Sequence, residues 1–302
     1  MNVTIPEGVL YLTAGADCQA DRLVYLIVGW GRGREAWLLE TAVLHGEPRE
    51  PKVSEDLAKA TIEASWRFPQ GGDIRIGRMF CDTGFHWEET LRFCKEHWSG
   101  GRMLPCKGLG ADKRKTVGGG PIIHSEVRTK RPPYTVVVNI DVNVAKDQIA
   151  VMLAKTEPGA GFIHIPSGPG GTPVRGFDQH VIEEFTSESC TVRMVNGFKQ
   201  YTWHKVAHRS NERLDCLVYA LAALIHSRVN LDKLSGPLVE QPAQKEGDSQ
   251  EAKQTQRPKW GAQTLNVTDP YIQMLQREQQ AQRVQQVPNG MRWGVQNKGV
   301  QW

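Results

Sequence analysis

Three apolar runs with short connections open the chain and constrain its fold more than any other feature. Residues 9–17, 22–30 and 35–44 are rich in β-branched and aromatic side chains, and only a few polar or glycine residues separate them. Connections this short join antiparallel neighbours, because parallel strands need a crossover of about a dozen residues. The sequence therefore predicts three consecutive antiparallel strands.

The middle of the chain alternates between helix and strand patterns, which is typical of strands that join a sheet in parallel. The first helix is expected over 53–67, with Ser54 as its N-cap. Further strands are predicted over 74–81, 102–108, 134–141 and 161–166, further helices over 87–98, 142–155, 177–185 and 211–229, and a hairpin over 191–206. The predicted fold class is α/β, a mixed sheet of three antiparallel and then parallel strands with helices on both faces.

The composition changes abruptly after Leu234. Residues 240–263 are rich in Gln, Lys and Glu and almost free of large apolar side chains. Such a segment cannot bury enough apolar surface to fold, so we expect disorder. A short helix is predicted over 269–286, with Asp269 as its cap and Pro270 in its first position. We therefore expect a folded domain over 1–230 and a Gln-rich, flexible, largely disordered tail over 231–302.

The overall composition indicates the cellular environment of the protein more clearly than it indicates the function. The 6 cysteines form no C-x-x-C pair, which favours reduced core thiols over disulfides or a thiolate metal site. No apolar run reaches the roughly 18 residues of a membrane span. The start of the chain lacks a signal-peptide pattern, so a cytoplasmic protein is expected. The formal net charge of +4 permits a polyanionic partner without requiring one.

Three aspartates stand at the ends of buried segments. Asp17 closes the first apolar run, Asp82 follows the strand over 74–81, and Asp215 lies in the apolar helix over 211–229. Asp17 alone could form a turn, and Asp82 alone could cap a helix. A buried carboxylate is costly without a donor, a base or a cation, and the sequence offers no evident basic partner. A cluster of three would bind hard divalent cations, which predicts metal-assisted phosphodiester chemistry unless a lysine or arginine fills the gap between them.

Four motifs carry a resemblance to a known family. TAGADCQADRLVYLIVGWGRGREAWLLE, FCDTGFHWEE, LPCKGLG and RSNERLDCLVYALAAL resemble the nuclease half of the large terminase subunit of lambda-like tailed bacteriophages, over roughly residues 9–230. The resemblance implies an RNase H-like fold and a two-metal endonuclease that uses Mg²⁺ or Mn²⁺. Its substrate would be double-stranded concatemeric viral DNA, cut during genome packaging in the host cytoplasm.

The resemblance also assigns roles to individual residues. It makes Asp17, Asp82 and Asp215 the catalytic and metal-binding residues, and Asp21 and Glu212 are candidate auxiliary acids that are more simply surface or salt-bridged residues. The implied partners are DNA, the small terminase subunit, and the portal of the prohead, where the tail would dock. The basic residues expected to contact DNA phosphates are Lys107, Lys113, Arg114, Lys115, Arg209 and Arg213. These basic residues could instead be solvated loop charges, and Arg209 and Arg213 could pair with Asp215.

Two other functions remain open from the sequence. The same fold could cut RNA–DNA hybrids or branched junctions as an RNase H or resolvase does, or it could be a non-catalytic docking module whose tail binds a partner. The sequence also contains no G-x-x-x-x-G-K-[ST] motif, which the ATPase motor of a large terminase would carry. Cutting, rather than translocation, is the activity expected of this chain alone.

Overall fold

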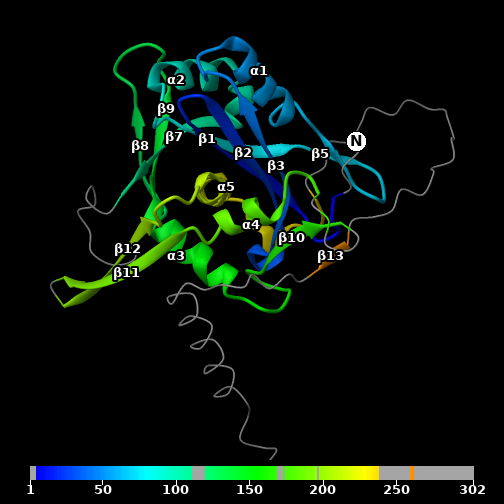
Figure 1. The fold of residues 1–302 in the computed structure, drawn as a ribbon. Helices are drawn as coiled ribbons and strands as arrows, with labels where there is room; N and C mark the ends of the chain where they lie inside the picture. The colour runs from blue at the N-terminus through cyan, green and yellow to red at the C-terminus, as the bar shows by residue number, and fades with distance from the viewer. Residues whose placement is uncertain are drawn as a thin grey trace, which may run out of the picture.

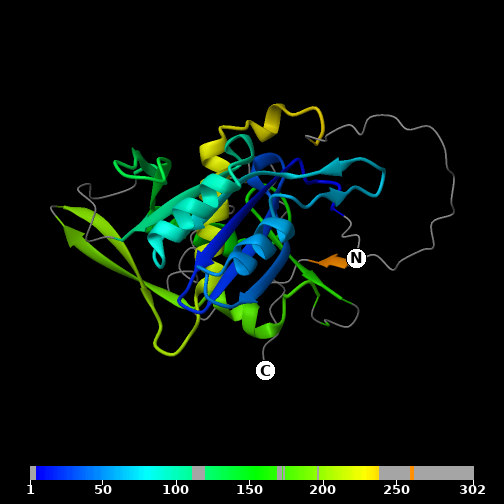
Figure 2. The same cartoon turned by 90° about the horizontal axis from the view of Figure 1, so that it is seen from above.

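A computed structural model describes residues 5–110, 120–168, 172, 174–195, 197–237 and 259–261. Lys113, Arg114, Lys115 and the helix predicted over 269–286 lie outside these residues. The part that is described forms one mixed sheet with helices packed on both of its faces (Figures 1 and 2).

The sheet begins with the predicted antiparallel strands. β1 (Tyr11–Cys18), β2 (Arg22–Trp30) and β3 (Ala36–His45) pair in this order, and β1 then pairs in parallel with β6 (Ile76–Asp82). β7 (Met103–Leu109) and β9 (Val136–Asp141) continue the parallel arrangement. This run of three antiparallel and then parallel strands confirms the predicted mixed sheet.

Three further strands extend the sheet at its two edges. β8 (Ile123–Arg128) pairs antiparallel with β9, β10 (Ile163–Ser167) pairs in parallel with β3, and β13 (Lys259–Gly261) pairs antiparallel with β10. The sequence did not predict β8, whose side chains are mostly exposed. It also did not predict β13, which lies within the segment expected to be disordered.

Helices cover both faces of the sheet, as predicted. α1 (Pro51–Ala60) and α2 (Trp87–Glu96) pack on one face, and α3 (Val142–Leu153), α4 (Gln179–Glu184) and α5 (Glu212–Ser227) pack on the other (Figure 1). The smaller elements are the ribbon β4 (Trp66–Arg67) and β5 (Asp73–Ile74), the hairpin β11 (Glu188–Val195) and β12 (Phe198–Lys205), and the short 3-10 helices Arg32–Arg34, Ser99–Gly101 and Leu231–Lys233.

α1 differs from its prediction at both ends. It begins at Pro51, whose fixed φ suits the first helical position, and Glu50 precedes it as the N-cap. Ser54 therefore lies inside the helix, where its hydroxyl donates a hydrogen bond to the Pro51 carbonyl (3.0 Å). The predicted end at residue 67 is wrong as well, because Trp66 pairs with Ile74 in the β4–β5 ribbon.

The described chain keeps packing on the domain beyond residue 230. Leu231 is buried, and the Gly33 amide donates to the Asp232 carboxylate (2.8 Å). The division into a domain over 1–230 and a tail over 231–302 stays a prediction. Among the helices that the structure describes, none combines the length and the apolar character needed to cross a membrane.

Candidate active site

β1 and β6 place the first two acids side by side. Ala16 pairs with Cys81 in the parallel register, so Asp17 and Asp82 each lie one residue further along neighbouring strands. Neighbouring strands are about 4.8 Å apart, and residues in equivalent positions point to the same face. Asp17 and Asp82 thus meet at the carboxyl ends of two central strands.

The third acid reaches the same place because α5 lies unusually close to β1. A Cβ on Gly15 would stand 2.0 Å from the Cys216 carbonyl oxygen, so only glycine allows this contact. The Thr13 hydroxyl donates to the Ala220 carbonyl (2.8 Å) and fixes the next turn of the helix. Asp215 directly precedes Cys216, so its carboxylate enters on the Asp17 side of the sheet.

Burial and, to a smaller extent, mutual repulsion raise the pKa values of Asp17 and Asp82. Asp17 is 4% exposed, and burial together with the charges of Asp215 and Asp82 raises its pKa to about 8, although the Gln19 amide donates to it (2.5 Å). Burial also raises the pKa of Asp82, against the Gly84 amide (2.8 Å) and the Tyr219 hydroxyl, which both donate to it. Three carboxylates compete for one poorly hydrated space.

Asp215 has a basic partner that the sequence did not identify. Lys146 of α3 contacts both the Glu188 carboxylate (2.6 Å) and the Asp215 carboxylate (2.9 Å). Asn211 also donates to both, at 2.7 and 2.9 Å. Burial raises the pKa of Asp215, whereas the Lys146 charge lowers it. Within the described residues Lys146 forms no ion pair with Asp17 or Asp82, so it lies on the Glu188 side of Asp215.

The two candidate auxiliary acids are both salt-bridged. Asp21 is exposed and lies 2.7 Å from Arg22, and the buried Glu212 binds the same guanidinium. Glu212 still adds its charge to the field at Asp17. Arg22 therefore contacts Asp21 and Glu212, and Lys146 contacts Glu188 and Asp215. Asp17 and Asp82 accept hydrogen bonds only from neutral donors in the described part of the chain.

The three aspartates provide the kind of oxygen ligands that a hard cation prefers, but their side chains are not arranged as a complete metal-binding site. Carboxylate oxygens are what Mg²⁺ and Mn²⁺ prefer. As the side chains stand, however, no group of three His, Cys, Asp or Glu residues among those described is arranged to hold a metal ion. Both Asp215 oxygens are already engaged, one by Lys146 and the other by Asn211.

The residues expected to contact DNA have different surroundings. Lys107 of β7 places its ammonium over the Trp87 ring, 5.3 Å from the ring centroid. Arg209 is exposed beside α5. Arg213 is 11% exposed and lies 2.9 Å from the buried Glu184. Arg213 therefore stabilises the α4–α5 contact, and the expectations that it binds DNA or pairs with Asp215 are not supported.

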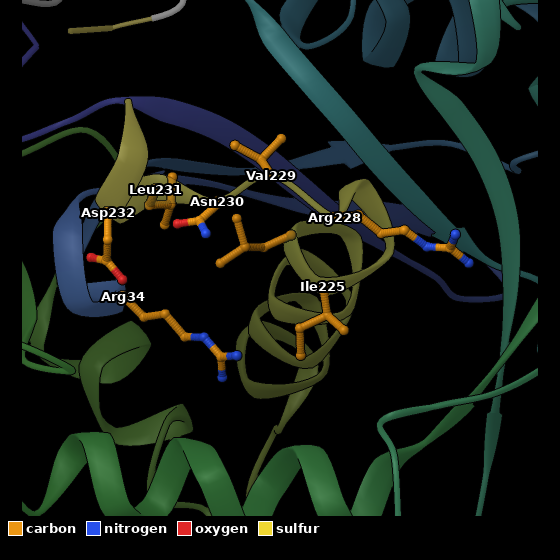
Figure 3. A pocket seen from close by; sticks show the side chains of 8 residues that line it. Arg34, Ile225, Arg228, Val229, Asn230, Leu231 and Asp232 are labelled. Carbon is orange, nitrogen blue, oxygen red and sulfur yellow. The ribbon is translucent and has the colours of Figure 1, made fainter. Parts of the chain in front are cut away.

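A cavity of about 310 Å³ lies at the opposite end of α5 from Asp215. Figure 3 shows Ile225 and Arg228 from the end of the helix, with Arg34 and Asp232 across the space. None of the three acids lines this cavity. It therefore plays no part in the candidate active site.

Sequence reasoning missed the residues that surround the three acids. Lys146 comes from α3 and Glu188 from β11, whereas Asn211 and Tyr219 stand at the start and in the middle of α5, so no single local motif connects all four. Lys146 occupies a buried position of an otherwise ordinary helix, and a lysine in such a position is the one signal that could have been noticed.

The fold and the site together define an α/β domain with acidic side chains at the carboxyl ends of its central strands. The family model described as "Terminase large subunit gpA, endonuclease domain" matches residues 1–235. The chain belongs to this family.

Individual relatives agree with the family match. The large terminase subunit of Escherichia phage lambda is 32% identical over 225 residues, which cover 73% of this chain and 33% of the relative. That of Enterobacteria phage P21 is 32% identical over 229 residues, with the same coverage. The chain thus spans about a third of the length of these relatives. A solved nuclease domain of the large terminase subunit gp2 of bacterial virus Sf6, with manganese and beta-thujaplicinol, aligns at a TM-score of 0.41 and 10% identity, over 71% of this chain and 89% of that one.

Proposed function

We propose that this chain is a divalent-metal-dependent endonuclease that hydrolyses phosphodiester bonds of double-stranded DNA. Its substrate would be concatemeric viral DNA, cut in the host cytoplasm during genome packaging. The observation that carries the proposal is the convergence of Asp17, Asp82 and Asp215 from β1, β6 and α5 in a member of the terminase endonuclease family. Partners such as the small terminase subunit and the portal of the prohead are part of the same proposal and rest on the family resemblance.

Asp17, Asp82 and Asp215 would hold two Mg²⁺ or Mn²⁺ ions. Their oxygens suit these ions. Burial first, and then the negative charges of Asp215 and Asp82, raise the pKa of Asp17, and a cation would relieve the repulsion among these charges. When bound, the ions would supply an activated water and charge stabilisation at the leaving oxygen.

The surrounding residues hold the acids in position in the absence of metal. Tyr219 and the Gly84 amide orient Asp82, and Gln19 orients Asp17. Lys146 neutralises Asp215 while it stays bound to Glu188. Because the Lys146 ammonium keeps Glu188 as a second partner, its contact with Asp215 can be given up to a cation without leaving the lysine unpaired. Lys146 thereby reduces the electrostatic destabilisation that the clustered acids cause in the metal-free protein.

The test is plasmid cleavage with Mg²⁺ or Mn²⁺ by the wild type and by Asp17→Asn, Asp82→Asn and Asp215→Asn. Each substitution keeps the side-chain shape and removes one charged ligand, so we expect cleavage to fall by on the order of a hundredfold or more. The matched control is Asp56→Asn, whose exposed carboxylate on α1 pairs with Lys52. Circular dichroism should show that all four variants remain folded. Full activity in any of the three would remove that residue from the site.

Two further measurements separate the alternatives. Competition among linear duplex, RNA–DNA hybrid and four-way junction would reveal a preference for hybrid or branched substrates. Calorimetry with Mn²⁺ tests the non-catalytic alternative, which predicts no binding of divalent metal.

A further inference from the structure

A groove separates α2 from the β8–β9 hairpin, and none of the three acids lines it. It has a volume of about 520 Å³. Trp87 and Leu91 of α2 form one wall, and Val127 and Val137 of the hairpin contribute apolar surface to the other. Trp87 is 39% exposed and Val127 is 51% exposed. The groove therefore presents apolar and aromatic surface to solvent.

The rim of this groove is basic. Arg128, Lys130 and Arg131 line it and are exposed, and the described residues give them no ion-pair partner. Glu88 is the one acid in the lining, and Lys107 adds a further positive charge from above the Trp87 ring. An apolar floor with an excess of positive charge at its rim is complementary to a ligand with flat rings and negative groups.

The hairpin holds these groups in a fixed loop. The Thr129 amide donates to the Thr135 carbonyl (2.9 Å), and the Thr135 amide donates back to the Thr129 hydroxyl (3.0 Å). The Thr129 hydroxyl also lies 3.0 Å from the Pro133 carbonyl. A loop that is already held by such hydrogen bonds loses less conformational entropy on binding a ligand than a flexible loop does.

The groove is close to the site along the sheet. Asp82 pairs with Cys106 of β7, and the next residue, Lys107, pairs with Asn139 of β9, which lines the groove. Two spacings between neighbouring β-strands amount to about 10 Å, a distance that a few nucleotides of a DNA strand can span. Trp87 also follows Asp82 closely in the chain, at the first position of α2. The groove lies on the α2 face of the sheet and the acids lie on the α5 face, so a DNA strand bound at the acids would pass around the carboxyl edge of the sheet to reach the groove.

We propose that this groove binds unpaired nucleotides of the DNA strand next to the cut, with a base against Trp87 and its phosphates at Arg128, Lys130 and Arg131. The proposal rests on the function proposed above and adds a preference for locally single-stranded DNA. A groove of this volume is in the range of sites for single small molecules, so it has room inside for one or two bases. Stacking on an aromatic ring tolerates any base, so little sequence preference is expected.

The experiment measures binding of the full chain to labelled DNA by fluorescence anisotropy in EDTA, so that cleavage plays no part. One probe is a blunt duplex, and the other is the same duplex with a short single-stranded tail. We expect the wild type to bind the tailed probe more tightly than the blunt duplex. Relative to the wild type, Trp87→Ala should bind the tailed probe roughly tenfold more weakly and should bind the blunt duplex equally well. The matched control is Trp98→Ala at the other end of α2, where the side chain is 42% exposed and lies outside the groove.

A charge variant tests the basic rim independently. Arg128→Ala with Arg131→Ala should lower the salt dependence of binding to the tailed probe, by about one unit of slope for each phosphate that the variant no longer neutralises. Lys52→Ala on α1 is the control for an exposed charge. Equal weakening on both probes, or unchanged binding by Trp87→Ala, would overturn the groove proposal and leave the nuclease proposal intact. Failure of the wild type to bind either probe would count against the nuclease proposal itself.

Discussion

At the scale of single residues, the unusual feature is a carboxyl group that titrates far from its ordinary range. Burial and the charges of Asp215 and Asp82 raise the pKa of Asp17 from 3.8 to about 8. A raised pKa in the folded state means that the protonated form is preferred there. Its stabilising contribution is complete below about pH 3.8 and is lost as the pH rises through about 8.

This shift predicts how stability depends on pH without metal. In EDTA, the free energy of unfolding of the wild type should fall as the pH rises from 5 to 9. This fall should exceed the fall in Asp17→Asn by on the order of a few kcal/mol. Urea denaturation at pH 5, 7 and 9 measures it. Asp17→Asn should be the more stable protein at pH 9, because the amide cannot ionise. Parallel curves for the two proteins would show that Asp17 titrates normally.

At the scale of elements, the site depends on the contact between α5 and β1. Gly15 allows the α5 backbone to reach β1, and Thr13 fixes the next turn of the helix. Asp215 is held near Asp17 only while this contact is kept. A change at Gly15 therefore affects both the core and the site.

Gly15→Ala should destabilise the protein by about 1–3 kcal/mol or more, because the new methyl group would clash with the Cys216 backbone carbonyl. Displacement of α5 would also reduce cleavage. Urea denaturation and plasmid cleavage measure the two effects. Gly110→Ala is the control, since a Cβ there meets no atom of the described residues within 4 Å. Wild-type stability of Gly15→Ala would mean that α5 is not held against β1.

The elements also show how far sequence patterns reach. Apolar runs and short turns predicted β1, β2 and β3, and strand ends predicted where Asp17 and Asp82 lie, because these signals are local. β8 was missed because its residues are largely exposed and show no apolar pattern. The contact of Lys146 with Glu188 and Asp215 joins residues far apart in the chain, and only tertiary packing brings them together.

At the scale of the whole molecule, negative and positive charge are separated. Asp17 and Asp82 are buried at the carboxyl ends of central strands, with Asp215 of α5 beside them. The β8–β9 and β11–β12 hairpins project from the same side of the domain (Figures 1 and 2). Arg131 and Lys130 on the first hairpin and Arg193 and Lys205 on the second are exposed. The basic side chains of the two hairpins attract a polyanion, whereas the acids repel it. A metal cation bound between the acids and the polyanion would remove this repulsion.

This charge separation predicts that metal stabilises the whole fold. Mn²⁺ that binds the folded state alone raises the free energy of unfolding by about 2.7 kcal/mol at a hundred times its Kd. The melting temperature of the wild type at pH 8 should therefore rise with Mn²⁺ and return to its starting value with EDTA. Asp17→Asn and Asp215→Asn should lose most of this rise, and Asp56→Asn should keep it. The same rise in all four proteins would place the bound metal elsewhere, because the acids of β1 and α5 would then contribute nothing to its binding.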